Sequence, residues 1–140
     1  PAARQKRYAK MFADAGVDHI ISSHPHVLQP YATVKRNGKS YPVMYSMGNF
    51  VSGMARPVTK ETIILSLTLQ REEDGTVSLQ KQKYYPCYLL DFDFDSDDAF
   101  VLLPQDPRYN GGFWEKAPSE LTKELRTHFA HIRKVVDKLR

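Results

Sequence analysis

The chain has 140 residues, a formal net charge of +4 and 41% hydrophobic residues, which fits one domain with a buried core. It has no run of the roughly 20 apolar residues that a membrane-spanning helix needs. The basic N-terminus has no apolar stretch behind it, so we do not expect a signal peptide in this segment. The single cysteine, Cys87, excludes an internal disulfide and a four-cysteine zinc site. Because residue 1 is not methionine, we expect the chain to begin inside a longer protein.

The first predicted element is a helix over residues 3–15, which Gly16 ends in a left-handed conformation. Apolar residues at three- and four-residue spacing predict its packing face. They are Tyr8, Met11, Phe12 and Ala15. An apolar run after the glycine then predicts a short buried strand, which leads into the loop 22–26. The strand residues are Val17, Ile20 and Ile21.

Two hairpins are predicted next. Residues 31–46 flank Asn37-Gly38, the pair best suited to a tight turn with two positive φ angles. Residues 61–85 form the second hairpin, with its turn at 73–75. Both strand pairs are antiparallel, because each turn is short.

The C-terminal part contains a long helix with one apolar face, which Ser119 is placed to cap. That face consists of Leu121, Leu125, Phe129, Ile132, Val135, Val136 and Leu139. The stretch 91–118 before it is rich in Asp, Pro and Gly, and we expect mostly loop there. The order of elements predicts an α+β fold with mostly antiparallel strands and helices near both ends. We expect residues 1–90 to form one unit and residues 91–140 a loop region with the terminal helix.

The sharpest local motif is His24-Pro25-His26. Two imidazoles one residue apart, directly after a buried strand, can point at neighbouring metal ions from one loop. Pro25 should hold His24 in an extended backbone conformation and stiffen this loop. Taken alone, such a triplet is more often an ordinary loop feature than a pair of ligands.

Two segments, Phe12 to Pro30 and Tyr45 to Phe50, resemble the bacterial capsule-synthesis family of CapA-type proteins, associated with poly-γ-glutamate capsules. This family is placed in the calcineurin-like metallophosphoesterase superfamily. The resemblance implies that the chain is the C-terminal portion of a four-layer αββα sandwich. It also implies that His24 and His26 bind two divalent metal ions, with manganese, iron or zinc as the plausible metals. Ser23 and Asn49 would then lie near the site.

Most metal ligands of the superfamily come from earlier Asp-, His- and Asn-containing motifs, which are absent from the 23 residues before His24. We therefore expect metal-dependent hydrolysis in a full-length parent and no activity from this chain alone. Ser22 also stands where the family usually has glycine. The expected partner is the missing N-terminal half of the same domain or a second copy of the chain. The resemblance places the parent at the cell surface or on the extracellular side of a bacterial membrane.

A non-catalytic function is the alternative, in which the parent binds an anionic capsule polymer or an assembly partner. The net charge permits attraction to polyanions. Nucleic acid is a poor fit, since the chain has no phosphate-binding glycine loop and no base-reading motif. The basic terminal helix would suit a partner helix or a membrane surface, but we favour packing on its own domain, because one apolar face is all that such packing requires.

Other candidate residues have plain structural interpretations. Asp91 to Asp98 superficially resembles a calcium loop, but the glycine at its sixth position and the glutamate at its twelfth are missing, so a solvated acidic loop is expected. His128 and His131 lie one helical turn apart, where we expect one at the core edge and the other in solvent. His19 is expected to pack or to support a ligand. Trp114 is expected in a small cluster under a loop.

Overall fold

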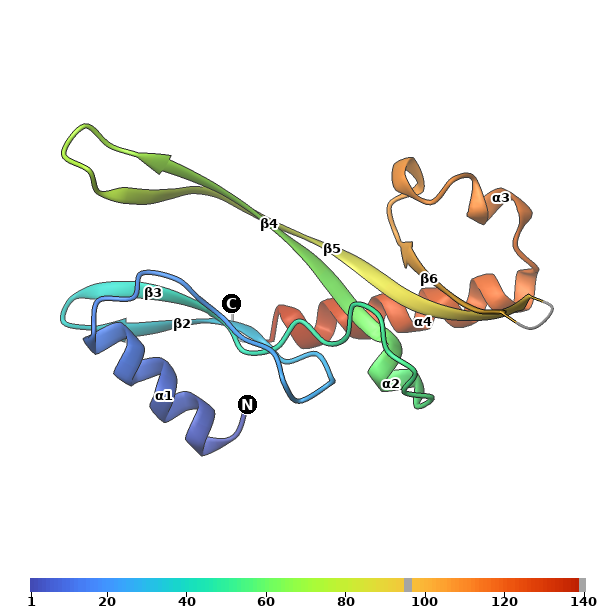
Figure 1. Ribbon diagram of the computed structural model, residues 1–140, viewed down its shortest axis with the longest axis horizontal. Coiled ribbons are helices and arrows are strands. Elements are labelled where there is room, and N and C mark those ends of the chain that lie inside the picture. Colours follow the sequence, from blue (N-terminus) through green and yellow to red (C-terminus); the bar gives the residue numbers. More distant parts are fainter. Residues whose placement is uncertain (95–96, 139–140) are drawn as a thin grey trace.

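The computed structural model describes residues 1–94 and 97–138. Its first part joins α1 (Ala3–Asp14) to a sheet of β1 (Ile20–Ile21), β2 (Tyr31–Arg36) and β3 (Lys39–Met44), in the order β1-β3-β2 (Figure 1). β2 and β3 are antiparallel and turn at Asn37-Gly38, where both φ angles are positive as expected. β1 pairs in parallel with β3 and forms one edge of the sheet.

The second part is a long antiparallel sheet in the order β4-β5-β6. It follows α2 (Pro57–Lys60) and consists of β4 (Glu61–Arg71), β5 (Val77–Phe94) and β6 (Asp97–Pro104). The β4–β5 hairpin extends well beyond the rest of the molecule at its turn (Figure 1). A 3₁₀ turn η1 (Pro107–Tyr109) and α3 (Phe113–Lys116) lead to α4 (Ser119–Val136), which lies across β4 and β5.

One core cluster joins the two sheets through α4. The helix buries four apolar side chains, Leu125, Phe129, Ile132 and Val136. They pack with residues of both sheets, including Met44 of β3 and Leu103 of β6. Each fully buried side chain of this kind contributes about 1.5–3 kcal/mol. The predicted apolar face of the terminal helix is therefore confirmed over its described length, and Leu139 lies outside the described residues.

The predicted packing face of the first helix is wrong. Met11 and Phe12 expose 55% and 51% of their surface, whereas Ala9 and Ala13 are buried against β2 and β3. Small side chains let the helix backbone approach the sheet closely, and the larger apolar residues are left on the outer face. The predicted burial of β1 is also wrong in this chain. β1 is the edge strand next to β3, and Ile21 is 48% exposed there.

The prediction of loop over 91–118 is wrong at its start, since β5 continues to Phe94 and pairs with β6. Asp and Phe alternate there, and this alternation suits a strand as well as a loop. Ser119 does not cap α4, because it is the first helical residue and Pro118 stands at the cap position. The division at residue 90 stays a prediction, although β5 runs through it.

The α+β class, both antiparallel hairpins and the helices near both ends are confirmed. Among residues 1–94 and 97–138, no helix is long and apolar enough to cross a membrane. The acidic stretch 91–98 includes residues outside the described part of the chain, so its comparison with a calcium loop stays untested.

Candidate metal site

The loop that carries both histidines is fixed at its two ends, to the last residue of β3 and to the segment that follows β3. At its start, the Ser22 backbone N–H donates to the Met44 carbonyl at 2.9 Å and continues the parallel pairing of β1 with β3. At its end, the Gln29 N–H donates to the Ser46 carbonyl at 3.0 Å, and Leu28 forms a bridge with Met47. The histidine loop therefore stands at the carboxyl end of β1.

Both histidines adopt a backbone conformation that L-residues rarely adopt. The φ angle is 101° at His24 and 58° at His26. The expected extended conformation of His24 before Pro25 is therefore wrong. Such conformations cost about 1–3 kcal/mol each and persist where the surroundings hold them. Ser22 is not among the residues with positive φ, so serine fits at the position where the family usually has glycine.

Asn49 determines which nitrogen of His26 carries the proton. The Asn49 amide nitrogen donates to the Thr59 carbonyl at 2.9 Å, and more weakly to the His26 carbonyl at 3.4 Å. Its Oδ1 therefore faces the His26 Nδ1, at 2.7 Å, and has to accept from it. In the neutral ring this leaves a lone pair on Nε2, which is the atom that a metal ion would bind.

Asn49 itself is held by a tight backbone crossing. Gly48 has a φ of 76° and forms a bridge with Thr62, whose hydroxyl donates to the Met47 carbonyl at 2.8 Å. A Cβ added at Gly48 would lie 2.5 Å from the carbonyl oxygen of Glu61. Only glycine fits at this position. The neighbouring Asn49 is 7% exposed, whereas His26 is exposed at the surface.

His24 and Ser23 are also exposed. The structure brings His26 into contact with Asn49, while Ser23 and His24 precede His26 in the same loop. Over the described ranges, the His24 ring and the Ser23 hydroxyl have no hydrogen-bonding partner, and no group of three or more His, Cys, Asp or Glu side chains could hold a metal ion. Two accessible imidazoles, one of them oriented by an amide, fit part of a metal-ligand set and need further donors.

Comparisons with known proteins agree with this arrangement of motifs. Residues 1–54, which include the histidine loop and Asn49, match the family described as bacterial capsule synthesis protein PGA_cap. The chain belongs to the bacterial capsule synthesis family. It is 30% identical over 137 residues to the capsule biosynthesis protein CapA of Bacillus anthracis, covering 94% of this chain. It is 35% identical over 75 residues, 54% of this chain, to the PGA biosynthesis protein CapA of Bacillus subtilis.

The matches cover 31% of the length of the Bacillus anthracis protein and 19% of that of the Bacillus subtilis protein. The chain thus spans less than a third of these capsule synthesis relatives. No solved structure matches it significantly.

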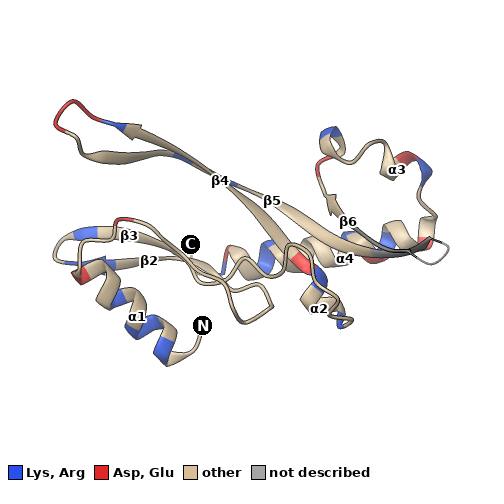
Figure 2. Ribbon diagram, viewed as in Figure 1, with Lys and Arg blue, Asp and Glu red and all other residues tan. Residues whose placement is uncertain are grey.

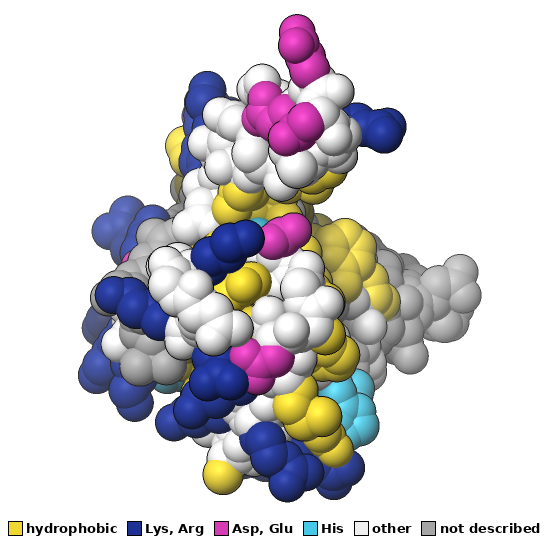
Figure 3. All heavy atoms as spheres, turned by 90° about the vertical axis from the view of Figure 1, so that its left-hand side faces the viewer, with side chains coloured by type: hydrophobic (Ala, Val, Ile, Leu, Met, Phe, Trp, Pro, Cys, Tyr) yellow, Lys and Arg dark blue, Asp and Glu magenta, His cyan; other side chains and the backbone are white. Residues whose placement is uncertain are grey.

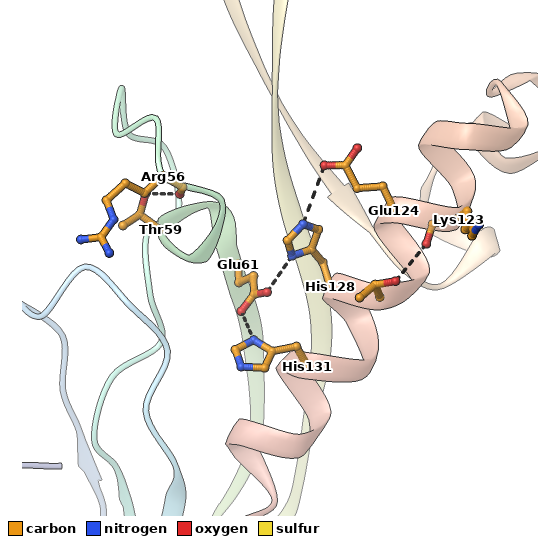
Figure 4. A network of polar contacts seen from close by, with 8 residues as sticks. Arg56, Thr59, Glu61, Lys123, Glu124, His128 and His131 are labelled. Atoms are coloured by element: carbon orange, nitrogen blue, oxygen red, sulfur yellow. Dashed lines mark hydrogen bonds and ion pairs between the residues drawn. The ribbon is translucent and has the colours of Figure 1, made fainter.

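A second polar cluster of this capsule-synthesis chain was missed by sequence reasoning. The Glu61 side chain at the start of β4 is 3% exposed and accepts from both His128 and His131 of α4, at 2.8 and 2.6 Å from their Nδ1 atoms (Figure 4). The His128 and His131 side chains are 18% and 47% exposed, which fits the expected core-edge and solvated positions. The spacing of the two histidines in the sequence could not reveal their contact with Glu61, which lies 67 residues before His128.

Three further candidates lie outside the histidine loop. His19 contacts the Tyr31 hydroxyl through Nε2 at 3.1 Å, and burial lowers the pKa of its imidazole. Trp114 packs on Phe129 of the core and donates to the Gln105 carbonyl, in the kind of cluster expected for it. Cys87 is fully buried, and burial raises the pKa of its thiol to about 11, so it is not a reactive nucleophile at neutral pH.

Proposed function

We propose that this chain supplies His24 and His26 as ligands to a two-metal centre of a longer capsule-biosynthesis protein that hydrolyses a phosphoester or a related bond. The observation that carries the proposal is the contact of the His26 Nδ1 with Asn49 Oδ1, which turns the metal-binding nitrogen outward. When bound, two divalent ions such as manganese, iron or zinc would supply Lewis acidity and an activated water nucleophile.

The chain's own residues have defined tasks in this proposal. Asn49 holds the His26 ring in one tautomer, and the backbone bonds of Ser22 and Gln29 fix the loop at both ends. This preorganisation reduces the conformational freedom that the loop would lose when it binds an ion. His24, with no protein partner among the described residues, is free to bind the second ion.

The remaining ligands would come from residues outside this chain, and the exposed surface beside the loop supports such a partner. One edge of β1 is open, and the neighbouring apolar side chains Met11, Phe12, Val17 and Ile21 are exposed. Figure 3 shows hydrophobic side chains between basic ones on the end of the molecule that it faces. We propose that the N-terminal part of the same domain, or a second copy, packs here, as a four-layer sandwich requires.

The proposal is tested by measuring turnover with a longer protein that includes these 140 residues and is as long as the CapA relatives. We expect hydrolysis of bis-p-nitrophenyl phosphate with manganese, and its loss in His24→Ala and in His26→Ala. His19→Gln, which changes a histidine outside the loop, is the matched control and should retain turnover. Unchanged turnover in both loop variants would overturn the assignment.

A non-catalytic binder of an anionic capsule polymer at the cell surface is the second candidate. The formal net charge of +4, which permits attraction to a polyanion, supports it. If a protein as long as these relatives folds but binds no metal and shows no turnover, this candidate would be supported over the hydrolase.

A further inference from the structure

The β4–β5 hairpin is a two-stranded arm that extends beyond the rest of the molecule (Figure 1). α4 covers the root of the arm, where Leu65 packs against the main core cluster. Farther out the arm exposes apolar side chains, since Leu69 on β4 is 58% exposed and Val77 on β5 is 53% exposed. A hairpin with no third strand and no helix on either face is only marginally stable in water. A partner strand would therefore stabilise the outer part of the arm.

The outer edge of β4 offers backbone groups to such a partner. β4 is the edge strand of its sheet, and its start is covered by the segment after β3, where the Ile63 N–H donates to the Met47 carbonyl. Backbone groups point alternately to the two sides of a strand. The odd-numbered residues after Ile63 therefore direct their N–H and C=O groups away from β5. Over residues 65–71, these groups have no partner in the described part of the chain.

The open edges of the two arm strands differ in charge. Residues 62–70 of β4 contain no charged residue, no proline and no glycine, and leucine alternates with serine and threonine in the middle of this stretch. On the other side of the arm, β5 is uncovered before the residues that pair with β6, and it carries Lys81 and Lys83 there. Lysine on an edge strand discourages pairing with another chain, whereas an uncharged edge strand is a template for it. The edge of β4 is therefore the one suited to accept a strand.

β4 is complementary to a second copy of itself in the antiparallel direction. A two-fold axis at Thr68, the middle of the uncovered stretch 65–71, would pair this whole stretch. Leu67 would lie opposite Leu69 on both sides of the axis, and Thr68 would lie opposite its own copy, which are favourable cross-strand pairs. No like charges would meet, since Arg71 is the one charged residue in the stretch and would face a leucine. Such an interface closes on itself and gives a dimer rather than a filament.

The two ends of the arm carry opposite charges. The turn is acidic at 72–74, and the root follows the basic residues Arg56 and Lys60 at the two ends of α2 (Figure 2). Glu61, also at the root, is buried and already accepts from two histidines. In the two-fold arrangement, each acidic turn would lie beside the basic root of the other copy. This charge complementarity favours a second copy, in the antiparallel orientation, as the partner.

We propose that two copies of this chain associate through their β4 edges, with the two-fold axis at Thr68, and join their β4-β5-β6 sheets into one continuous sheet. This surface is separate from the histidine loop and from the open edge of β1, so the dimer does not depend on a bound metal. The dissociation constant rises with salt concentration, because salt screens the exposed charges at the two ends of each arm.

Sedimentation velocity of the purified chain in EDTA tests this association. We expect a dimer, and Leu67→Lys should raise its dissociation constant at least about tenfold, because an ammonium group would lie in the interface on either side of the axis. Ile21→Lys adds the same charge to the open edge of β1 and should change the constant less than about twofold. Circular dichroism establishes that both variants are folded. A monomeric chain, filaments, or dissociation by Ile21→Lys alone would overturn the proposal.

Cysteine cross-linking tests the register. Thr68→Cys should form a disulfide-linked dimer with oxidised glutathione, because the two copies of this residue would face each other across the axis. Gln80→Cys on β5 is the matched control and should stay unlinked, and the native Cys87 is fully buried. Faster linking of Gln80→Cys than of Thr68→Cys would contradict the register.

The same association should occur in a protein as long as the CapA relatives, where Leu67→Lys should again weaken it. His24→Ala/His26→Ala should leave the dimer intact, which separates this proposal from that of the metal centre. A monomeric longer protein would show that its own additional residues cover β4, and it would overturn the proposed dimer.

Discussion

The Oδ1 of Asn49 lies 2.7 Å from the Nδ1 of His26, although the two residues are 23 positions apart. The amide nitrogen of the same Asn49 is fixed by the Thr59 carbonyl at 2.9 Å. A buried amide with both ends engaged can present only its oxygen to the histidine. One hydrogen bond thus determines the tautomer of a surface imidazole in a strained loop.

Asn49→Ala should release that ring. In the unchanged chain, the ring nitrogen shifts of His26 should show a proton on Nδ1 and a bare Nε2. In the variant they should show a mixture of tautomers, and the free energy of unfolding should fall by about 1–3 kcal/mol because the Thr59 carbonyl loses its donor. Long-range nitrogen–proton NMR correlations and urea unfolding measure both effects. Ser23→Ala is the control, and a proton on Nε2 in the unchanged chain would refute the assignment.

Gly48→Ala should destabilise the chain more than Gly38→Ala. Both glycines have positive φ angles, 76° and 75°, so each variant bears a conformational cost of about 1–2 kcal/mol. The Gly48 Cβ would also lie 2.5 Å from the Glu61 carbonyl, whereas nothing lies within 4 Å at Gly38. Urea unfolding of the two variants compares them directly. Equal losses would show that the backbone crossing at Gly48 is looser than described.

Removing both histidines beside Glu61 should cost about 3–5 kcal/mol, because His128→Ala/His131→Ala leaves a buried carboxylate without a partner. Adding Glu61→Gln to this variant should recover part of the loss, since the buried group is then neutral. Glu124→Gln, at a contact of 3.9 Å on the surface, should change stability by less than about 1 kcal/mol. A triple variant less stable than the double variant would contradict this explanation.

His19 should make the chain less stable in mild acid. Burial lowers its pKa below the unperturbed value of 6.5, so between the folded and unfolded values the unfolded chain binds more protons. The neutral ring's contribution is present above about pH 6.5 and is lost as the pH falls towards the folded-state value. Melting temperatures from pH 8 to 5 should fall less steeply in His19→Gln. Parallel curves for the two proteins would rule out this contribution.

Local signals predicted much of the fold. Asn37-Gly38 and Gly75 predicted the turns of the two hairpins. Such turns need positive φ angles, and the residue types at the turn itself determine whether these are accessible. The periodic apolar face of α4 predicted its buried side in the same way.

What sequence reasoning missed depends on contacts between distant segments. The spacing of apolar residues in α1 could not show that Ala9 and Ala13 face the sheet while Phe12 stays exposed. The pairing of Glu61 with His128 and His131 required the register of α4 on β4. The alternation of Asp and Phe after residue 90 fitted both loop and strand, and pairing with β6 decided between them. Pro25 failed to predict the backbone of His24, because bonds at both ends of the loop override the local preference.

The claim that His24 and His26 bind metal is tested most directly by the metal content of a protein that contains these residues and is as long as the CapA relatives. Elemental analysis after dialysis should find two divalent ions per chain in the unchanged protein and in His19→Gln. It should find a loss of bound metal in His24→Ala/His26→Ala, with the fold retained by circular dichroism. Full retention of both ions in that double variant would contradict the assignment of His24 and His26 as ligands.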